Sequence, residues 1–318
     1  MQEKIIDFLK SKQGYASGEE ISQRLRISRQ ALWKHIQHLK DSGYGIEAVP
    51  HLGYQLCGLP DRLFPLEISS SLQTKIIGKK IYYFDLVHST MDSAAELARK
   101  NCPEGTLVVA ESQSKGRGRL GREWSSPKYK GIYISLILRP KILPSQAPVF
   151  TLLSAVSACE ALKEACALSA QIKWPNDLMV NNKKIGGILT ELNAETDEVH
   201  SLIIGIGINV NNDRKSLLNQ ATSVKEEKGQ AASRIGLLQE LLRKLEVNYL
   251  TLQEEGTQPI IEKWRLLNIT LGRRIKISSH NRLIEGEASD IDADGALLLR
   301  KDSGLTQRIT SGDVMHCR

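Results

Sequence analysis

Apolar residues recur at helical spacing within the first 60 residues of the chain. Ile21 and Leu25 lie four positions apart, and Leu32, Ile36 and Leu39 form a second stripe at i, i+4 and i+7. Only six residues separate the two stripes. The pattern therefore predicts two short helices joined by a tight turn.

Capping residues support this pair of helices. Ser17 and Glu20 have the spacing of a capping box, in which Glu20 reaches back to the first backbone N–H, and Ser28 caps the second helix. The segment from Gly18 to Gln37 thus predicts a helix-turn-helix, and residues 46–56 predict a hairpin, or wing, behind it. A purely structural helix bundle is the alternative. The polar face of the second helix carries side chains suited to phosphates and base edges, namely Ser28, Arg29, Gln30, Trp33, Lys34 and Gln37.

The pattern changes twice in the rest of the chain. Residues 61–270 mix strands, such as 131–139, with helices, of which 147–166 is predicted to be buried and amphipathic. Residues 271–318 form short apolar runs separated by turn residues, which predicts a small β-barrel or sandwich. We therefore predict an α+β protein with three domains at residues 1–60, 61–270 and 271–318.

Composition narrows the class of protein. A length of 318 residues suits two or three domains, and the net charge of +7 makes DNA or nucleotides plausible partners. The five cysteines are dispersed without a CxxC pair, as expected for reduced thiols in the cytoplasm. The histidines form no close metal-binding pattern. The chain shows neither a signal peptide nor a membrane span, so we expect a cytoplasmic protein with no membrane partner.

The strongest motif is Gln113-Ser-Lys-Gly-Arg-Gly-Arg-Leu-Gly-Arg-Glu-Trp124. Its glycines match the dinucleotide fingerprint GxGxxG, but that fingerprint requires a helix opening at the glycines, and here a strand is predicted to follow. Glycines let the backbone approach a ligand closely, and Arg117, Arg119 and Arg122 supply planar donors for phosphate or carboxylate. The alternative is a solvated basic loop.

Three further motifs carry polar residues near predicted strand ends. In Lys173-Trp-Pro-Asn-Asp177, Asn176 and Asp177 could bind a nucleotide or Mg²⁺, although Pro-Asn-Asp alone is most often a turn. Lys184 precedes a Gly-Gly pair that admits a ligand close to the backbone. The strand ending at Asn209 carries two glycines that leave space on one side, or that pack against another strand.

The set GRGRxGRxW, KWPND and KxGGIL(T/V)E, in this order and spacing, resembles the biotin–protein ligases that carry an N-terminal repressor domain. The resemblance covers nearly the whole chain. It implies a winged helix-turn-helix, a catalytic domain with a mainly antiparallel sheet like that of class II synthetases, and a small SH3-like barrel. In this family the Gly/Arg loop is mobile and closes over biotin and the adenylate.

The resemblance also implies roles for individual residues. Lys184, Arg119 and Asp177 would be catalytic, with Asp177 assisting Mg²⁺. Met91 stands where the family more often has Asn, and Lys115 where it more often has Ala. The biotin contacts would be Ser89, Thr90, Met91, Gln113, Gly116, Arg117, Gly118, Arg119, Lys184 and Gly187. The ATP and adenylate contacts would be Arg119, Arg122, Trp124, Lys173, Asn176 and Asn209.

The implied activity is that of an ATP-dependent, AMP-forming biotin–[acetyl-CoA-carboxylase] ligase. It forms biotinyl-5′-AMP and transfers biotin to a lysine of the biotin carboxyl carrier protein, or of another biotin-dependent carboxylase. The adenylate-bound homodimer would also repress biotin genes at an operator. ATP, Mg²⁺ and biotin are thus the expected ligands, with no tightly bound cofactor. Two alternatives remain: a ligase whose N-terminal domain is only regulatory, and a biotin-sensing transcription factor without catalysis.

Overall fold

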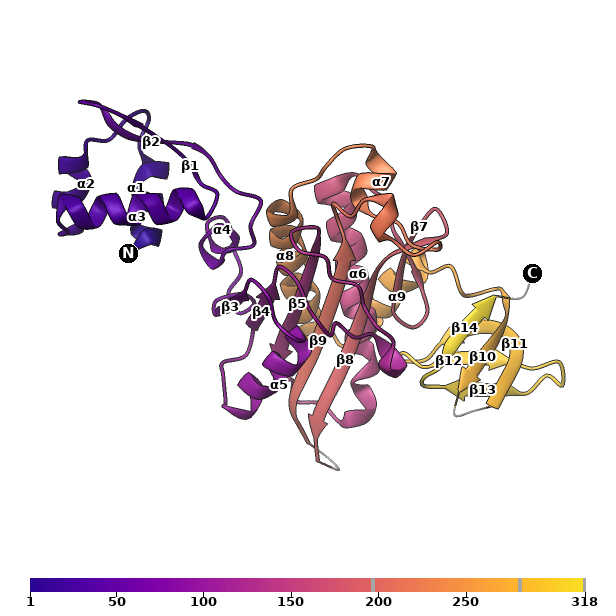
Figure 1. Ribbon diagram of the computed structural model, residues 1–318. Helices are drawn as coiled ribbons and strands as arrows, with labels where there is room; N and C mark the ends of the chain where they lie inside the picture. The colour runs from indigo at the N-terminus through magenta and orange to yellow at the C-terminus, as the bar shows by residue number, and fades with distance from the viewer. Residues whose placement is uncertain (196–197, 280–281, 317–318) are drawn as a thin grey trace. The chain divides into compact units, whose positions relative to one another are not determined.

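The computed structural model describes residues 1–195, 198–279 and 282–316, and the chain divides into two compact units, Met1–Arg62 and Leu63–Arg318. The first unit is a three-helix cluster followed by an antiparallel hairpin (Figure 1). This arrangement confirms the predicted helix-turn-helix with a wing. Its elements are α1 (Gln2–Ser11), α2 (Gly18–Leu25), α3 (Arg29–Asp41), β1 (Gly45–Val49) and β2 (Gly53–Gly58).

Serine residues cap the N-termini of α2 and α3. The Ser17 hydroxyl accepts a hydrogen bond from the backbone N–H of Glu20, and the Ser28 hydroxyl accepts one from Ala31, both at 3.1 Å. The Glu20 carboxylate, predicted to complete the capping box, forms an ion pair with Lys12 at the end of α1. That pair joins α1 to α2, in addition to the buried apolar residues between the helices.

A seven-stranded sheet forms the centre of the second unit, in the order β3-β4-β5-β9-β8-β7-β6. The β3–β4 pair is parallel and the remaining neighbours are antiparallel, which confirms the predicted mainly antiparallel sheet. The strands are β3 (Ile81–Phe84), β4 (Thr106–Ala110), β5 (Gly131–Leu138), β6 (Gln171–Lys173), β7 (Asp177–Val180), β8 (Lys183–Ala194) and β9 (Val199–Asn209).

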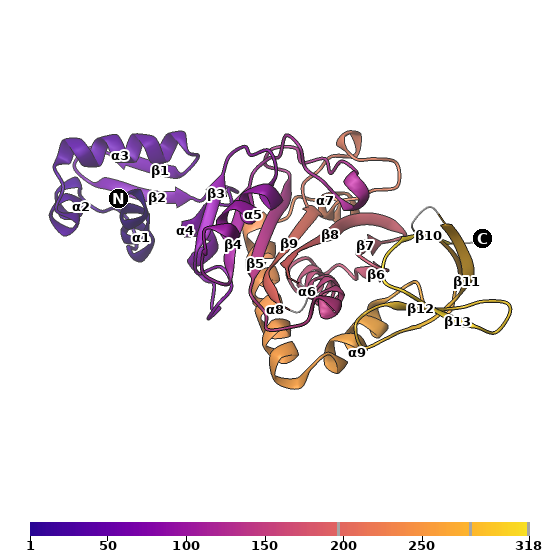
Figure 2. The ribbon, with the colours of Figure 1, turned by 90° about the horizontal axis from the view of Figure 1, so that it is seen from below.

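Helices cover both faces of this sheet (Figure 2). One face packs against α6 (Pro148–Cys166), α8 (Arg234–Glu255) and α9 (Gln258–Leu267), and the other packs against α5 (Thr90–Arg99). The prediction that 147–166 is amphipathic was wrong, because α6 is buried on almost every side between the sheet and the other two helices. A helix in that position is apolar over most of its surface. The short helices are α4 (Pro65–Ser69) and α7 (Val224–Lys228).

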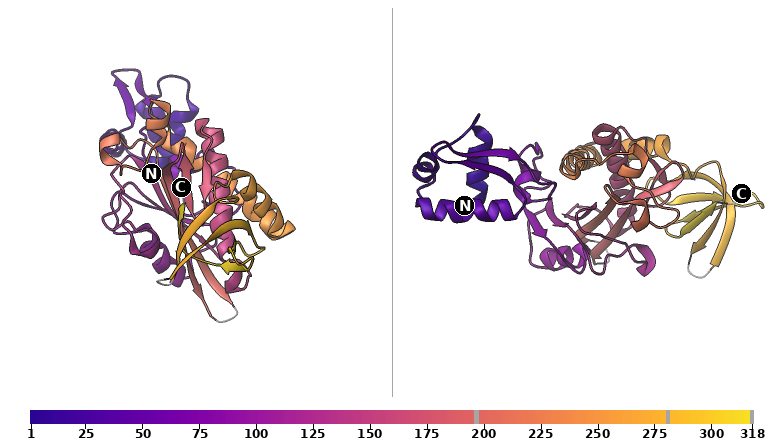
Figure 3. Two further views of the ribbon diagram at one scale, coloured as in Figure 1. Left: turned by 90° about the vertical axis from the view of Figure 1, so that its right-hand side faces the viewer. Right: turned by 45° about the horizontal axis from the view of Figure 1, so that its top comes forward.

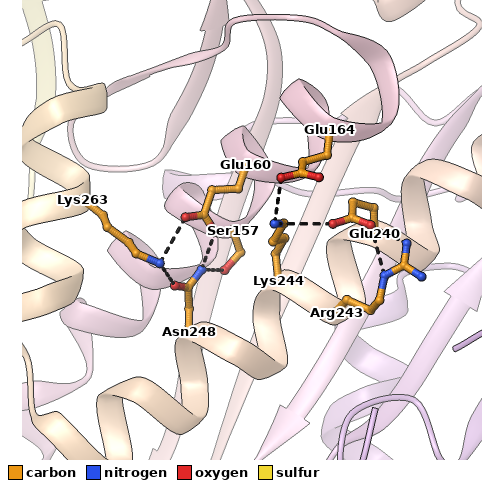
Figure 4. A network of polar contacts seen from close by, with 8 residues as sticks. All are labelled: Ser157, Glu160, Glu164, Glu240, Arg243, Lys244, Asn248 and Lys263. Atoms are coloured by element: carbon orange, nitrogen blue, oxygen red, sulfur yellow. Dashed lines mark hydrogen bonds and ion pairs between the residues drawn. The ribbon is translucent and has the colours of Figure 1, made fainter. Parts of the chain in front are cut away.

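Polar contacts join the three helices on the first face (Figure 4). The Asn248 amide donates to the Ser157 hydroxyl and to the Glu160 carboxylate, each at 2.9 Å. Lys263 of α9 donates to the Asn248 carbonyl oxygen at 2.7 Å and forms an ion pair with Glu160 at 3.1 Å. The network satisfies polar groups that lie between helices, so it fixes how α9 packs on α6 and α8.

A five-stranded antiparallel sheet completes the second unit, in the order β13-β12-β11-β10-β14, and lies beside α9 (Figure 3). Arg265 of α9 forms a bidentate ion pair with Asp290, with both N–O distances 2.9 Å. The buried Trp174 indole donates to the Gly295 carbonyl at 3.3 Å. The strands are β10 (Arg274–Ser279), β11 (Arg282–Ile291), β12 (Leu297–Arg300), β13 (Thr306–Ile309) and β14 (Asp313–His316).

The predicted boundary at residue 270 separates this sheet from the helices, and the three-domain division stays a prediction. Among the described residues no helix combines the length and apolarity needed to cross a membrane. The four described cysteines, Cys57, Cys102, Cys159 and Cys166, are free thiols, and Cys317 lies outside the described residues.

Candidate active site and DNA-binding surface

A pocket of about 1010 Å³ opens over strands β7, β8 and β9 of the central sheet. It brings together every residue that the sequence predicted to contact biotin, ATP or the adenylate, with the exception of Gly116. These residues come from separate segments of the second unit. They are Ser89, Thr90, Met91, Gln113, Arg117, Gly118, Arg119, Arg122, Trp124, Lys173, Asn176, Asp177, Lys184, Gly187 and Asn209.

The Gly/Arg motif forms a narrow hairpin beside this pocket. Trp124 donates its backbone N–H to the Gly116 carbonyl at 2.8 Å, and Gly118 donates to the Arg122 carbonyl at 2.7 Å. The only helical residues in it are a single 3₁₀ turn at Arg119–Gly121, and the next regular element is strand β5. A dinucleotide-binding helix therefore does not open at these glycines.

Two arginines of this hairpin contact protein groups. Arg119 donates to the Asn176 side-chain carbonyl and to the Gly312 backbone carbonyl, both at 3.3 Å. Arg117 forms ion pairs with Asp92 and, at 3.0 Å, with Glu191. These contacts argue against the alternative of a solvated basic loop, because they hold the hairpin against the pocket and the C-terminal sheet.

The glycines of β9 make room for two side chains that line the pocket. A Cβ atom on Gly207 would lie 2.6 Å from Cε2 and Nε1 of the Trp124 ring. One on Gly205 would lie 2.6 Å from the Met91 sulfur. The two interpretations of this strand thus both hold in part: the glycines admit close packing, and the groups packed there line the pocket.

Lys184 is part of the pocket lining. A bulge between Leu178 and Met179 shifts the register of β7 against β8, so that Lys184 pairs with Met179. Bulges of this kind redirect side chains beside active sites. The Lys184 ammonium forms an ion pair with Asp177 and lies 5.6 Å from the centre of the Trp124 ring. A cation is therefore held in the pocket beside an aromatic ring.

Buried polar groups occupy the end of the pocket near α5. The Gln113 carbonyl accepts hydrogen bonds from the Thr90 backbone and hydroxyl at 2.8 and 3.1 Å, and its amide donates to Ser126 at 2.9 Å. The Ser89 hydroxyl and the Trp124 indole N–H are buried with no hydrogen-bond partner among the described residues. Buried polar groups in folded proteins are normally satisfied, so both atoms point to a polar ligand.

Part of the pocket lining was not predicted from the sequence. Arg273 and Val314 reach the pocket from the C-terminal segment, and Lys215 and Leu218 reach it from the loop before α7. No motif marks these residues. The contact that places this loop at the pocket is visible only in the structure. The Lys184 backbone N–H donates a hydrogen bond to the Gln220 carbonyl at 2.9 Å and so joins the loop to β8.

The charge of the pocket is strongly positive. Its described lining carries two acidic residues, Glu123 and Asp177. The cationic residues outnumber them and comprise Lys173, Lys184, Lys215, Arg117, Arg119, Arg122 and Arg273. Such a lining favours a polyanionic ligand. Within the described residues, no three His, Cys, Asp or Glu side chains cluster as they would around a metal held by protein alone.

Helix α3, the second helix of the helix-turn-helix, carries the residues that the sequence predicts to contact DNA. Gln30, Trp33 and Lys34 are exposed, with Trp33 55% accessible, and Gln37 is half-buried. Arg29 is exposed but forms an ion pair with Glu19 of α2 at 2.6 Å. The Ser28 hydroxyl caps α3, so its side chain is already engaged in the fold.

Comparison with known proteins agrees with these features. The model of the biotin/lipoate A/B protein ligase family matches residues 83–209, an HTH domain matches residues 1–55, and the biotin protein ligase C-terminal domain matches residues 270–316. The chain is 42% identical to the bifunctional ligase/repressor BirA of Bacillus subtilis over 304 residues, which cover 94% of this chain and 93% of that protein. The chain belongs to the biotin protein ligase family.

More distant members of this family match most of the chain. The bifunctional ligase/repressor BirA of Escherichia coli is 32% identical over 308 residues, covering 94% of this chain and 92% of its own. The biotin protein ligase from Aquifex aeolicus, solved in complex with biotin and ATP, superposes with a TM-score of 0.64 at 30% identity. That structure covers 76% of this chain and 99% of its own. A helix-turn-helix followed by a ligase domain is the organisation that this chain has, and over nearly its whole length it is similar to the bifunctional ligase/repressors.

Proposed function

We propose that this chain forms biotinyl-5′-AMP from biotin and ATP and transfers the biotinyl group to a lysine of the biotin carboxyl carrier protein. The pocket carries this proposal. One end has buried hydroxyl and amide groups beside Met91, and the other end is lined by cations. An uncharged bicyclic ring suits the first end, and a triphosphate suits the second.

Lys184 lies where negative charge develops in the first step. The carboxylate of biotin attacks the α-phosphorus of ATP, a P–O bond forms, and pyrophosphate leaves. An anion thus approaches a polyanion, and fixed cations lower the barrier by stabilising the added charge. Lys184, held by Asp177 over the Trp124 ring, supplies one such cation, and Arg119 supplies another from the hairpin.

Three cationic side chains of the pocket lining suit the leaving pyrophosphate. Lys173, Lys215 and Arg273 line the pocket, and the structure pairs none of these three described side chains with an acid. We assign Arg273, in the C-terminal segment, to the β- and γ-phosphates. Asp177 would hold Mg²⁺ together with phosphate oxygens, because Mg²⁺ is usually bound by one or two carboxylates plus substrate phosphates. The bound Mg²⁺ would neutralise phosphate charge.

The second step requires the mixed anhydride to survive until the carrier arrives. The carrier lysine attacks the acyl carbon, the C–O bond to phosphate breaks, and AMP leaves. Water would destroy the anhydride, so a cover over the pocket is needed. The hairpin at Gly116–Trp124, tied to Asn176 and Gly312 through Arg119, provides one.

The first unit carries the regulatory half of the proposal. We propose that the adenylate-bound protein dimerises and represses biotin genes by placing α3 in the major groove of an operator. The exposed Gln30, Trp33 and Lys34 support this role. In a dimer, two helix-turn-helix modules read two half-sites of the operator. A single module would read one half-site and bind with much lower affinity.

Each half has its own test. The purified protein with biotin and radiolabelled MgATP, and no carrier, should accumulate biotinyl-AMP. Lys184→Ala should lower that rate by ~10²–10³-fold, and an unchanged rate would refute its role.

Footprinting upstream of biotin genes should show protection that tightens with biotinyl-AMP. Equal protection by the ligand-free protein would contradict the coupling, and none at all would leave the first unit as a regulator of catalysis.

A further inference from the structure

Arg117 is engaged in a way that its place in the Gly/Arg motif does not suggest. Its guanidinium meets two carboxylates from different elements, Asp92 in the first turn of α5 and Glu191 on β8. The Glu191 contact is bidentate, with Nη2 at 3.1 and 3.0 Å from the two carboxylate oxygens and Nε at 3.2 Å from one of them. The hydrogen bond to Glu191 raises the pKa of Arg117, and the Asp92 contact adds to this effect.

These contacts change the role that Arg117 can play. Its donors are directed at two protein carboxylates, so its charge is balanced within the fold. Arg119 lies two residues further along the hairpin and donates to neutral carbonyl oxygens of Asn176 and Gly312. The carboxylate partners of Arg117 hold its guanidinium on the protein rather than on a ligand.

Arg117, Asp92 and Glu191 form an ion-pair triad, and the location of Arg117 in the hairpin gives this triad a structural role. Its backbone bridges to Glu123 on the returning arm of the hairpin, immediately before Trp124. Asp92 directly follows Met91, which lines the end of the pocket near α5. The triad therefore ties the base of the hairpin to the helix that carries Ser89, Thr90 and Met91 and to the strand that carries Lys184.

We propose that Asp92 and Glu191 are positioning residues that hold the Gly116–Trp124 hairpin over the pocket through Arg117, and so set how long the adenylate is retained. This inference rests on the proposed ligase function and deepens it. Arg117 acts as the anchor of the cover, and the hairpin tip carries the cations that meet the ligand. Loss of the anchor should raise adenylate escape more than it changes the chemistry.

The test uses the double variant Asp92→Asn/Glu191→Gln, which keeps the shape of both side chains and removes their charge. Release of preformed, radiolabelled biotinyl-AMP should be faster by about tenfold, which corresponds to about 1.4 kcal/mol. The rate of adenylate formation at saturating biotin and ATP should change by less than about threefold. Asp92→Glu keeps a carboxylate and should release the adenylate close to the wild-type rate.

Glu96→Gln is the matched control, because Glu96 lies one turn further along α5 and pairs with Lys100 at 2.6 Å on the exposed surface. It should retain the adenylate as the wild type does. Wild-type release by the double variant, or equal acceleration by Glu96→Gln, would overturn the proposal. The single variants extend the test if the double variant unfolds, since each should accelerate release in part.

Limited trypsinolysis separates this inference from the ligase function. Trypsin can cut after Arg119 and Arg122 in the hairpin, and cleavage depends on opening rather than on catalysis. In the absence of any ligand, the double variant should be cut there about tenfold faster than the wild type. Faster cleavage of the hairpin in the double variant, with no adenylate formed by any variant, would refute the ligase proposal alone. Unchanged cleavage would refute the anchoring role of Arg117.

Discussion

Gly207→Ala tests the pocket through a single methyl group. The new Cβ would lie 2.6 Å from two atoms of the Trp124 indole and 2.9 Å from a third, where ordinary contacts begin near 3.4 Å. The ring must therefore move by roughly 1 Å, away from β9 and toward the space proposed for the adenylate. The β9 backbone at Gly207 lies in a regular antiparallel ladder, so alanine itself fits the strand.

The expected magnitude follows from that displacement. A misplacement of ~1 Å in an active site lowers the rate by up to ~10²-fold, which is about 2.7 kcal/mol in the barrier. Trp124 is proposed to meet the nucleotide, so the loss should appear mainly as a higher KM for ATP and slower adenylate formation. The KM for biotin should change little. The strain on folding should cost ~1–3 kcal/mol, as overpacking usually does.

Gly205→Ala is the matched control on the same strand. Its Cβ would lie 2.6 Å from the Met91 sulfur, the end of a flexible side chain that can move aside. This variant should mainly raise the KM for biotin, and by less. Steady-state kinetics with each substrate varied in turn, together with thermal unfolding, distinguish the two. A Gly207→Ala protein that folds normally and keeps its ATP KM would refute the placement of Trp124.

Three further predictions address other parts of the chain. Arg273→Ala should raise the KM for ATP about tenfold, while Lys301→Ala, an exposed change in the same segment, should not; equal effects would contradict the phosphate role. Arg234→Met leaves the buried Glu111 carboxylate without its 2.6 Å ion pair, so urea unfolding should show a loss of ~3–5 kcal/mol, and a loss below ~1 kcal/mol would be inconsistent with it. Lys34→Ala should weaken DNA binding for all sequences and lower the salt slope by about 1, and an unchanged slope would count against a phosphate contact.

The sequence was most informative where chemistry concentrates in short motifs. The Gly/Arg loop, the KWPND motif and the Lys184 segment are separated by up to about 60 residues. The structure brings them to one pocket because the Gly/Arg loop lies between β4 and β5, and β5, β9, β8 and β7 are successive neighbours in the sheet. Periodicity likewise predicted the helix-turn-helix and the wing. The roles of the individual site residues remain proposals.

Other features depend on tertiary contacts and had no local signal. The amphipathic expectation for α6 failed because two helices and a sheet surround it, which a pattern along one segment does not reveal. The ligand contact predicted for Arg117 stays a prediction, but its two carboxylate partners lie 25 and 74 positions away in the sequence, so the motif alone gave no sign of them. Arg273 reaches the pocket only because the C-terminal sheet packs beside α9.

The most direct test of the ligase function is transfer to a carrier. The purified full-length protein would be mixed with biotin, MgATP and a biotin carboxyl carrier domain, and the carrier would be examined by mass spectrometry. We predict one biotin in amide linkage to a carrier lysine, dependent on ATP. A proven carrier that stays unmodified by folded protein would contradict the account and leave a biotin-sensing regulator in its place.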